Sequence, residues 1–199
     1  MKLESYKLIF IVGGLIGVLI IASPALTGFI HFPSGERFSE LYLLGSGNMM
    51  ANYPFNIAVG QNNSVNVGVM NQLGSSAYYV LYVELKNQTD PYPDATPQSP
   101  SSLPPLYEYR FFASNDQTWA SKLNFTVSAA TFSESQSIIK VLTINNFAFN
   151  ANKPAEWDAT DKTFTYQLLF ELWTYNLKTS SITYNNRYVS LQLNLTQSS

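Results

Sequence analysis

The chain of 199 residues contains no cysteine, one histidine and few charged residues. Without cysteine there is no disulfide bond, no thiolate metal site and no cysteine nucleophile. Charged residues make up only 12% of the chain, and the net charge is −2. Because no cluster of Lys or Arg offers a basic surface, we expect no nucleic-acid partner.

Aromatic residues are abundant instead, with 13 Tyr and 13 Phe. Most of the remaining polarity comes from Asn, Gln, Ser and Thr, whose side chains do not ionise near neutral pH. A surface of this composition depends little on carboxylates, which take up protons in acid. We therefore hypothesise that the protein faces an acidic exterior.

One long hydrophobic segment, Leu8–Ile30, lies near the N-terminus and carries no charge. As a helix it would measure about 34 Å, enough for a hydrocarbon layer of about 30 Å. Lys2 and Lys7 precede it and Arg37 follows, a mild bias that predicts a cytoplasmic N-terminus. We expect a cytoplasmic segment at 1–7, a transmembrane signal anchor at 8–30, a linker at 31–37 and an extracellular domain at 38–199, in a single-pass protein of the cell membrane.

A cleaved signal peptide is the alternative, with small residues at 23–25 as a poor cleavage site.

Within the segment, Gly13 and Gly17 have the spacing of glycines that pack membrane helices together. Glycines that are merely tolerated in lipid would show the same spacing. The first expected partner is in either case membrane lipid.

From Phe38 onward the dominant hydrophobic period is two. Polar and apolar residues alternate over 64–69 and again over 187–195, as in strands with one buried face. About eight segments of this type are separated by turn-forming clusters such as 60–63 and 176–181. This pattern predicts an all-β fold, an immunoglobulin-like β-sandwich.

Two segments interrupt the pattern. Residues 87–105 contain six prolines, which remove ladder donors and predict a long loop between strands. Residues 149–162 form a second stretch that we expect to be irregular, with Trp157 packed at its base.

The residues of the first half resemble a known family. Phe38–Gly45 (FSELYLLG) and the run from Tyr53 to Thr89, with its VGQ turn, its Val-alternating strand and its aromatic strand, are similar to the archaeal domain-of-unknown-function 1616 family. The segment Arg187–Leu193 resembles the closing strand of that family. The resemblance implies an archaeal, membrane-associated protein with an extracellular β-domain. It implies no catalytic or binding residues, because the family has no established activity.

Residues with metal chemistry are few. His31, the only histidine, would lie beside the membrane boundary, where we expect an interfacial role, and one histidine cannot supply a zinc site. Glu156, Asp158 and Asp161 form the best acidic cluster and could offer oxygen ligands to Ca²⁺. Their spacing matches no known calcium loop, and Lys153 and Lys162 flank them, so we favour a solvated loop. We expect no metal and no cofactor.

Four N-x-S/T sequons are candidate glycosylation sites: Asn62, Asn87, Asn124 and Asn194. We expect the first two in turns and Asn124 on the outward face of a strand, opposite Leu123 and Phe125. About three sequons are expected by chance in a chain this rich in Asn, Ser and Thr, so their number alone indicates nothing.

No catalytic constellation emerges, and we expect a protein that is not an enzyme. The preferred hypothesis is a membrane-anchored extracellular structural or interaction protein that binds other envelope or membrane proteins. The alternative is a domain that binds envelope glycans through exposed Tyr residues and Trp119. Tyr78, Tyr79, Tyr82 and residues 107–111 are aromatic candidates for either surface, or for the core. An envelope hydrolase is a third, weaker hypothesis.

Overall fold

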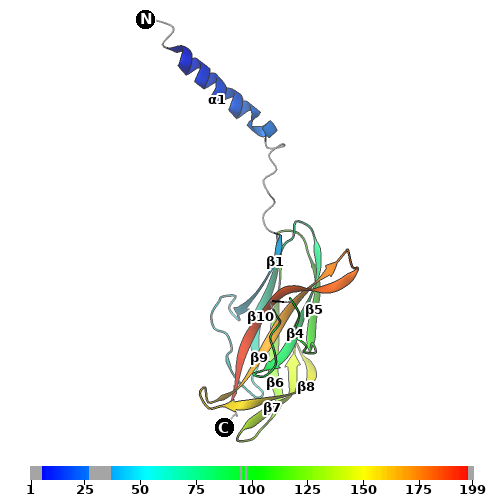
Figure 1. Ribbon diagram of the computed structural model, residues 1–199. Helices are drawn as coiled ribbons and strands as arrows, with labels where there is room; N and C mark the ends of the chain where they lie inside the picture. The colour runs from blue at the N-terminus through cyan, green and yellow to red at the C-terminus, as the bar shows by residue number, and fades with distance from the viewer. Residues whose placement is uncertain (1–5, 27–36, 95, 97, 197–199) are drawn as a thin grey trace. The chain divides into compact units, whose positions relative to one another are not determined.

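The computed structural model describes residues 6–26, 37–94, 96 and 98–196. The chain separates into two compact units, Met1–Arg37 and Phe38–Ser199. The first contains helix α1 (Lys7–Leu26), and the second contains ten strands (Figure 1).

Helix α1 begins before the predicted anchor and ends at Leu26, short of Ile30, and residues 27–36 lie outside the described residues. In the part of the chain that the structure describes, no helix has both the length and the hydropathy needed to cross a membrane. The structure thus does not reproduce the transmembrane helix expected over Leu8–Ile30.

The second unit is a sandwich of two sheets. Sheet A has the order β1 (Phe38–Gly45), β3 (Asn63–Gln72), β6 (Gln117–Phe132), β7 (Gln136–Ile144) and β8 (Phe147–Asp158), all antiparallel. Sheet B has the order β5 (Tyr107–Ala113), β4 (Ala77–Asn87), β9 (Thr163–Asn176), β10 (Ser181–Thr196) and β2 (Asn56–Ala58). Only β2 runs parallel to its neighbour. The predicted all-β sandwich is confirmed.

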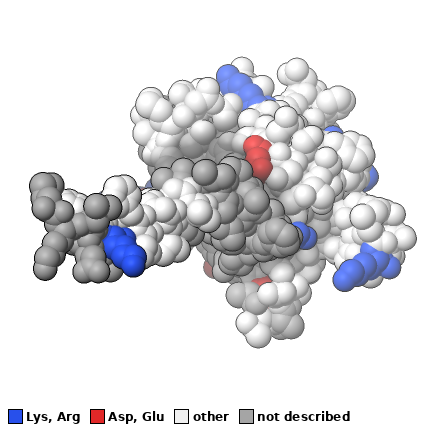
Figure 2. Space-filling view, turned by 90° about the horizontal axis from the view of Figure 1, so that it is seen from above, with Lys and Arg blue, Asp and Glu red and all other residues white. Residues whose placement is uncertain are grey.

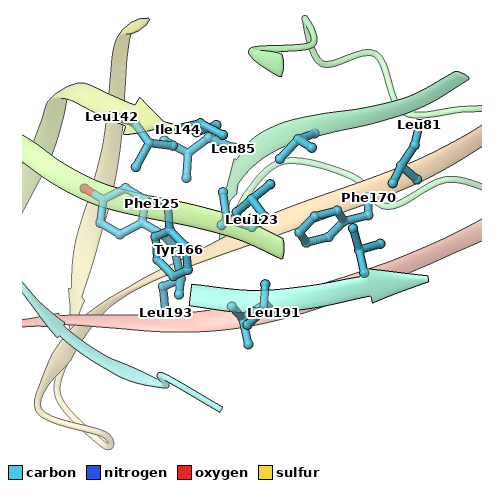
Figure 3. Packing of buried hydrophobic residues seen from close by; sticks show 14 of the residues in the cluster. Leu81, Leu85, Leu123, Phe125, Leu142, Ile144, Tyr166, Phe170, Leu191 and Leu193 are labelled. Carbon is cyan, nitrogen blue, oxygen red and sulfur yellow. The ribbon is translucent and has the colours of Figure 1, made fainter. Parts of the chain in front are cut away.

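The core is a continuous apolar layer between the sheets. Alternate residues of the central strands point into it, as the period of two predicted, and Figure 3 shows side chains of both sheets meeting there. Phe125 and Leu142 come from sheet A, whereas Leu81, Phe170 and Leu193 come from sheet B. All five are essentially inaccessible to solvent.

Two buried tyrosine hydroxyls connect the sheets. The Tyr79 hydroxyl, on β4, lies 2.8 Å from Ser39 Oγ on β1 and donates to Asn71 Oδ1 on β3 at 3.1 Å. On β9, the Tyr166 hydroxyl lies 2.7 Å from Ser137 Oγ on β7. Because buried polar groups without partners destabilise a fold, these bonds fix how the two sheets are placed on one another.

The segment expected to be irregular, residues 149–162, is instead largely strand β8. Residues 147–156 of β8 pair with β7 in sheet A. Trp157 and Asp158 then pair with Phe164 and Thr163 of β9 in sheet B. The strand therefore passes from one sheet to the other. Pro154 is tolerated because β8 is an edge strand of sheet A and has a neighbour on one side only. On its other side there is no described strand of sheet A that could accept a hydrogen bond from the backbone N–H that proline lacks.

Asparagine makes several of the turns. Asn145 and Asn146, with φ of 48° and 70°, form the two-residue connection between β7 and β8, where Ile144 pairs with Phe147. Two successive positive φ angles are the signature of a type I′ hairpin turn, and asparagine tolerates them better than most residues. The high asparagine content thus has a backbone role.

We predict that Tyr79→Phe destabilises the protein by about 1–3 kcal/mol, because Ser39 and Asn71 lose a buried partner. Tyr175→Phe, at an exposed position of β9, is the matched control and should leave the stability unchanged. Denaturant unfolding followed by tryptophan fluorescence measures both. Equal free energies of unfolding for the two variants would contradict the bridging role of Tyr79.

Candidate functional site

The outer face of sheet B is partly covered by residues 88–106, which we call the proline-rich loop. As predicted, the described residues of this segment form no strand; Asp94 and Ser99 form an isolated bridge. It leaves the end of β4, crosses the outer face of β4, β9 and β10, and returns to β5. Side chains on this face that would otherwise meet water are therefore buried.

Ser101 attaches the loop to two carboxylates on the sheet. Its backbone amide donates to Glu171 Oε1 at 2.6 Å, and its hydroxyl donates to Glu84 Oε2. Glu84 lies on β4 and Glu171 on β9, on the same outer face, diagonally across the ladder in which Glu84 pairs with Leu169. Both carboxylates are buried, with 2% and 0% of their surface exposed.

The carboxyl groups of this pair prefer the protonated state. The pKa of Glu84 is raised to about 7: burial raises it most, the hydrogen bond from Ser101 and the charge of Lys153 lower it, and the charge of Glu171 raises it. Burial also raises the pKa of Glu171, again against the hydrogen bonds from Ser101. Glu84 therefore takes up a proton between weakly acidic and neutral pH.

A second set of contacts holds the start of the loop. Tyr92 donates from its hydroxyl to Gln167 Oε1 at 2.5 Å, and its ring lies under the Lys86 ammonium, 4.2 Å from the centroid. Lys86 is itself buried and donates to the Asn87 carbonyl at 2.9 Å. Burial lowers the pKa of Lys86.

An ion pair ties this part of the loop to sheet A. Lys153 Nζ on β8 lies 2.8 Å from Asp90 Oδ2, which also accepts the Asn87 amide. Burial opposes ionisation of Asp90, but these hydrogen bonds outweigh it and lower its pKa. The loop is thus anchored near its start and at Ser101.

Beside the loop, a row of aromatic residues crosses sheet B. We call it the aromatic strip; it consists of Tyr82, Tyr92, Trp173, Tyr184 and Tyr188. The Trp173 ring lies 5.6 Å from that of Tyr82 and 5.7 Å from that of Tyr184, and the rings of Tyr92 and Tyr188 are 6.0 Å apart. Tyr188 is 41% exposed, and Trp173 Nε1 donates to Glu171 at 3.3 Å. The strip is therefore in contact with the carboxylate pair through the hydrogen bond from Trp173 to Glu171.

Only part of the aromatic surface expected from the sequence is exposed. Tyr82 belongs to the strip, and Tyr78 lies on the same face, with its ring 4.8 Å from that of Phe112. Tyr79, however, is fully buried between the sheets. Trp119 stacks on Phe111 with the ring centroids 3.9 Å apart and packs against the core. Trp119, expected to be an exposed sugar-binding residue, is thus half-buried, with Phe111 stacked on its ring.

Three hollows of about 350, 260 and 350 Å³ surround a different tryptophan, Trp157 on β8. This side chain is 43% exposed, and its ring packs against Phe164 at 5.0 Å. Glu134 and Glu156 border the hollows. The expected packing of Trp157 is thus present in its T-shaped contact with Phe164, while part of the side chain meets solvent.

The acidic cluster near Trp157 serves the turn between β8 and β9. Asp158 Oδ1 accepts the amides of Thr160 at 2.8 Å and Asp161 at 3.2 Å. Among the described residues, no group of three or more His, Asp or Glu side chains is arranged to hold a metal ion. His31 lies outside the described residues.

The sequons occupy different environments. Asn62, in the connection between β2 and β3, and Asn124, on β6, are exposed, and Asn124 faces outward between the buried Leu123 and Phe125. Asn194 on β10 is half-buried, with its amide 3.2 Å from Asn56 Oδ1. Asn87, expected in a turn, is instead the last residue of β4; it is buried, and its amide donates to the Pro154 carbonyl at 2.9 Å.

Sequence reasoning missed Glu84 and Glu171. The only available signal was a carboxylate within a dense apolar strand, in the runs YVELK and LFELW. A position on the outer face of a sheet is normally solvated, and the burial of both residues arises only because the proline-rich loop covers them.

Fold and site together define a β-sandwich domain with a loop fixed over one outer face. The chain belongs to the family described as domain of unknown function 1616, whose model matches residues 33–141. The match covers β1 to β6 and part of β7. No curated protein matches the chain significantly.

Solved structures with similar folds are distant in sequence. The CARDB domain of a Pyrococcus furiosus protein, determined in complex with di-metal ions, is 8% identical over 84% of this chain and 95% of that chain, with a TM-score of 0.41. A Listeria innocua β-glucosidase in complex with glucose is 10% identical over 81% of this chain and 16% of that chain, with a TM-score of 0.39. A human seminal plasma complex of zinc 2-glycoprotein and prolactin inducible protein gives 8% identity, 83% and 100% coverage and a TM-score of 0.39. We draw no functional argument from similarities at this level.

We predict that stability falls as the pH rises from about 4.5 to about 7. The folded state binds more protons than the unfolded state in this interval, because the pKa of Glu84 is raised to about 7 on folding. Glu84→Gln still accepts from Ser101 but carries no charge, so its profile should be flatter and its stability at mildly alkaline pH higher by on the order of 1–3 kcal/mol.

Denaturant unfolding at several pH values checks this prediction. Glu40→Gln, at an exposed position of β1, is the matched control and should follow the wild-type profile. A Glu84→Gln profile as steep as that of the wild type would contradict the assignment.

Proposed function

We propose that this protein is a membrane-anchored extracellular interaction domain without enzymatic activity. In this proposal the immunoglobulin-like sandwich binds a neighbouring envelope or membrane protein through the aromatic strip. The partner's contact surface is apolar and aromatic, with few charges.

The aromatic strip, in which Tyr92 and Tyr188 are exposed and the other three rings are half-buried, is the observation that carries the proposal. Tyr and Trp are enriched in the buried centres of protein interfaces, because they bring a large apolar area with few rotatable bonds. Here Trp173 and Tyr184 are held by neighbouring rings, by the Glu171 carboxylate and by the fixed loop. A surface that is already rigid loses little entropy when a partner binds.

The low charge of the surface fits the same role. In Figure 2 the charged side chains of the face in view are few and scattered on an otherwise uncharged surface. Depletion of charge is typical of interface centres. The uncharged segment Leu8–Ile30 supports placement at a membrane, and the protonation preference of Glu84 and Glu171 suits an acidic exterior.

A photo-crosslinking experiment tests the proposal. We expect p-benzoylphenylalanine in place of Tyr188 to form an adduct with one defined protein in intact cells. The same substitution of Tyr175 is the matched control, because Tyr175 is 40% exposed, close to the 41% of Tyr188, but lies outside the strip. Mass spectrometry identifies the adduct. No adduct at position 188, or equal adducts at both positions, would contradict a binding role for the strip.

The hollows around Trp157 favour binding of an envelope glycan as a second candidate function. Sugar rings stack on exposed aromatic faces and hydrogen-bond to nearby carboxylates, and Trp157 with Glu134 and Glu156 offers both groups. This site replaces Trp119 in the glycan hypothesis.

For this candidate we expect Trp157→Ala to abolish binding to a glycan array. Phe147→Ala, which removes an exposed ring on the same strand away from the hollows, should leave the binding unchanged. Absence of glycan binding by the wild-type protein would eliminate this candidate and leave the strip proposal untouched.

A further inference from the structure

Strand β5 is an open edge of sheet B. Among the described strands it pairs with β4 alone, and Figure 1 places it at the margin of its sheet. An edge of this type leaves alternate backbone amides and carbonyls without a strand partner, so it is a template for adding another strand. Its inward side chains are already fixed, since Phe111 stacks on Trp119 and Tyr109 accepts from Asn145 at 2.8 Å.

Two other sheet margins are less suited to strand addition. Strand β2 has three residues. Strand β1 also pairs on one side only, but Arg187 Nε donates to the Ser39 carbonyl at 3.2 Å beside it. Parts of β8 and β10 also lack a described strand partner on one side, so the choice of β5, with seven residues, rests on the chemistry of its side chains.

The outward side chains of β5 include two neighbouring opposite charges. Glu108 and Arg110 are exposed, and Phe112 is 76% exposed, whereas Leu106, just before the strand, packs against the core. The order along the outward face is therefore acidic, basic, apolar. Within one chain Arg110 Nε donates to Glu108 Oε1 at 2.6 Å. Both side chains of this ion pair are exposed to solvent.

An antiparallel pair of two β5 strands has one favourable register. In a continuous antiparallel sheet, residues that lie opposite one another on the two strands point to the same side of the sheet. The two-fold axis must therefore lie where one residue meets its own copy, and not between two successive residues. Centring the pair on Tyr109 sets Glu108 opposite Arg110 of the second copy, and Arg110 opposite Glu108 of that copy. Centring it on Glu108 or on Arg110 sets like charges opposite one another, which is destabilising. A parallel pair in register also aligns like charges.

We propose that a second copy of this chain binds at β5, antiparallel and centred on Tyr109, so that two sheets B join into one continuous sheet. Two cross-strand contacts define the interface, each between Glu108 of one copy and Arg110 of the other. This proposal does not rest on the function of the aromatic strip.

Charge reversal gives a sharp test on the full chain in detergent, followed by analytical ultracentrifugation. The wild type should sediment as a dimer. Glu108→Arg alone and Arg110→Glu alone should each be monomeric, because each sets like charges opposite one another twice. An equimolar mixture of these two single variants should form a heterodimer, and the double variant Glu108→Arg/Arg110→Glu should dimerise as the wild type does.

These outcomes separate the β5 interface from other modes of association. A wild-type monomer at all concentrations overturns the proposal. A dimer that persists in both single variants also overturns it and indicates another interface, such as one between the N-terminal helices. Circular dichroism of each variant confirms that the domain is folded, and the recovery of dimers in the mixture excludes misfolding as the cause of monomers. Crosslinking from position 188 to another protein is unaffected by either result.

Discussion

The structure depends on the apolar layer between two sheets that no disulfide bond holds together. In many small β-sandwiches a cystine joins the sheets, but this chain has no cysteine. Apolar packing alone is non-directional and would tolerate small displacements of one sheet over the other. Tyr79 and Tyr166 remove that freedom, because each hydroxyl has buried partners on the opposite sheet that only one placement satisfies. Strand β8, which pairs with both sheets, adds a covalent connection at one end.

The arrangement of side chains on the outer face of sheet B depends on the apolar layer beneath it. Once the inner face is fixed, the outer residues of β4 and β9 have fixed positions, and the proline-rich loop has a rigid surface to bind. The loop creates a second, smaller buried layer that is polar rather than apolar. Glu84, Glu171 and Lys86 are tolerated there because Ser101, Trp173, Tyr92 and the Asn87 carbonyl give them partners. The raised carboxyl pKa values are the remaining electrostatic consequence of this burial.

The alternation of apolar residues was enough to predict the sandwich, because sheet burial repeats every two residues wherever a strand is central. It failed at β8, where an edge strand with Asn, Lys and Pro154 buries only one side chain completely. The loop itself was predictable from its prolines, but its position was not. Burial of Glu84 and Glu171 arises from contacts with residues up to 70 positions away, and no local pattern encodes them. The solvent exposure of Trp119 could not be predicted for the same reason, because it depends on the side chains that the facing strand places against the ring.

The aromatic strip and the β5 margin belong to one sheet, and this has a geometric consequence. A two-fold axis perpendicular to the sheet keeps outer faces on the same side. Two copies joined at β5 would therefore place both strips on a single continuous face, with β5 of each copy between the strip and the junction. Phe112 and Tyr78 would lie between the strips and extend the aromatic surface. A partner with repeated contacts would then bind two strips at once, and weak binding at each would combine into strong binding overall.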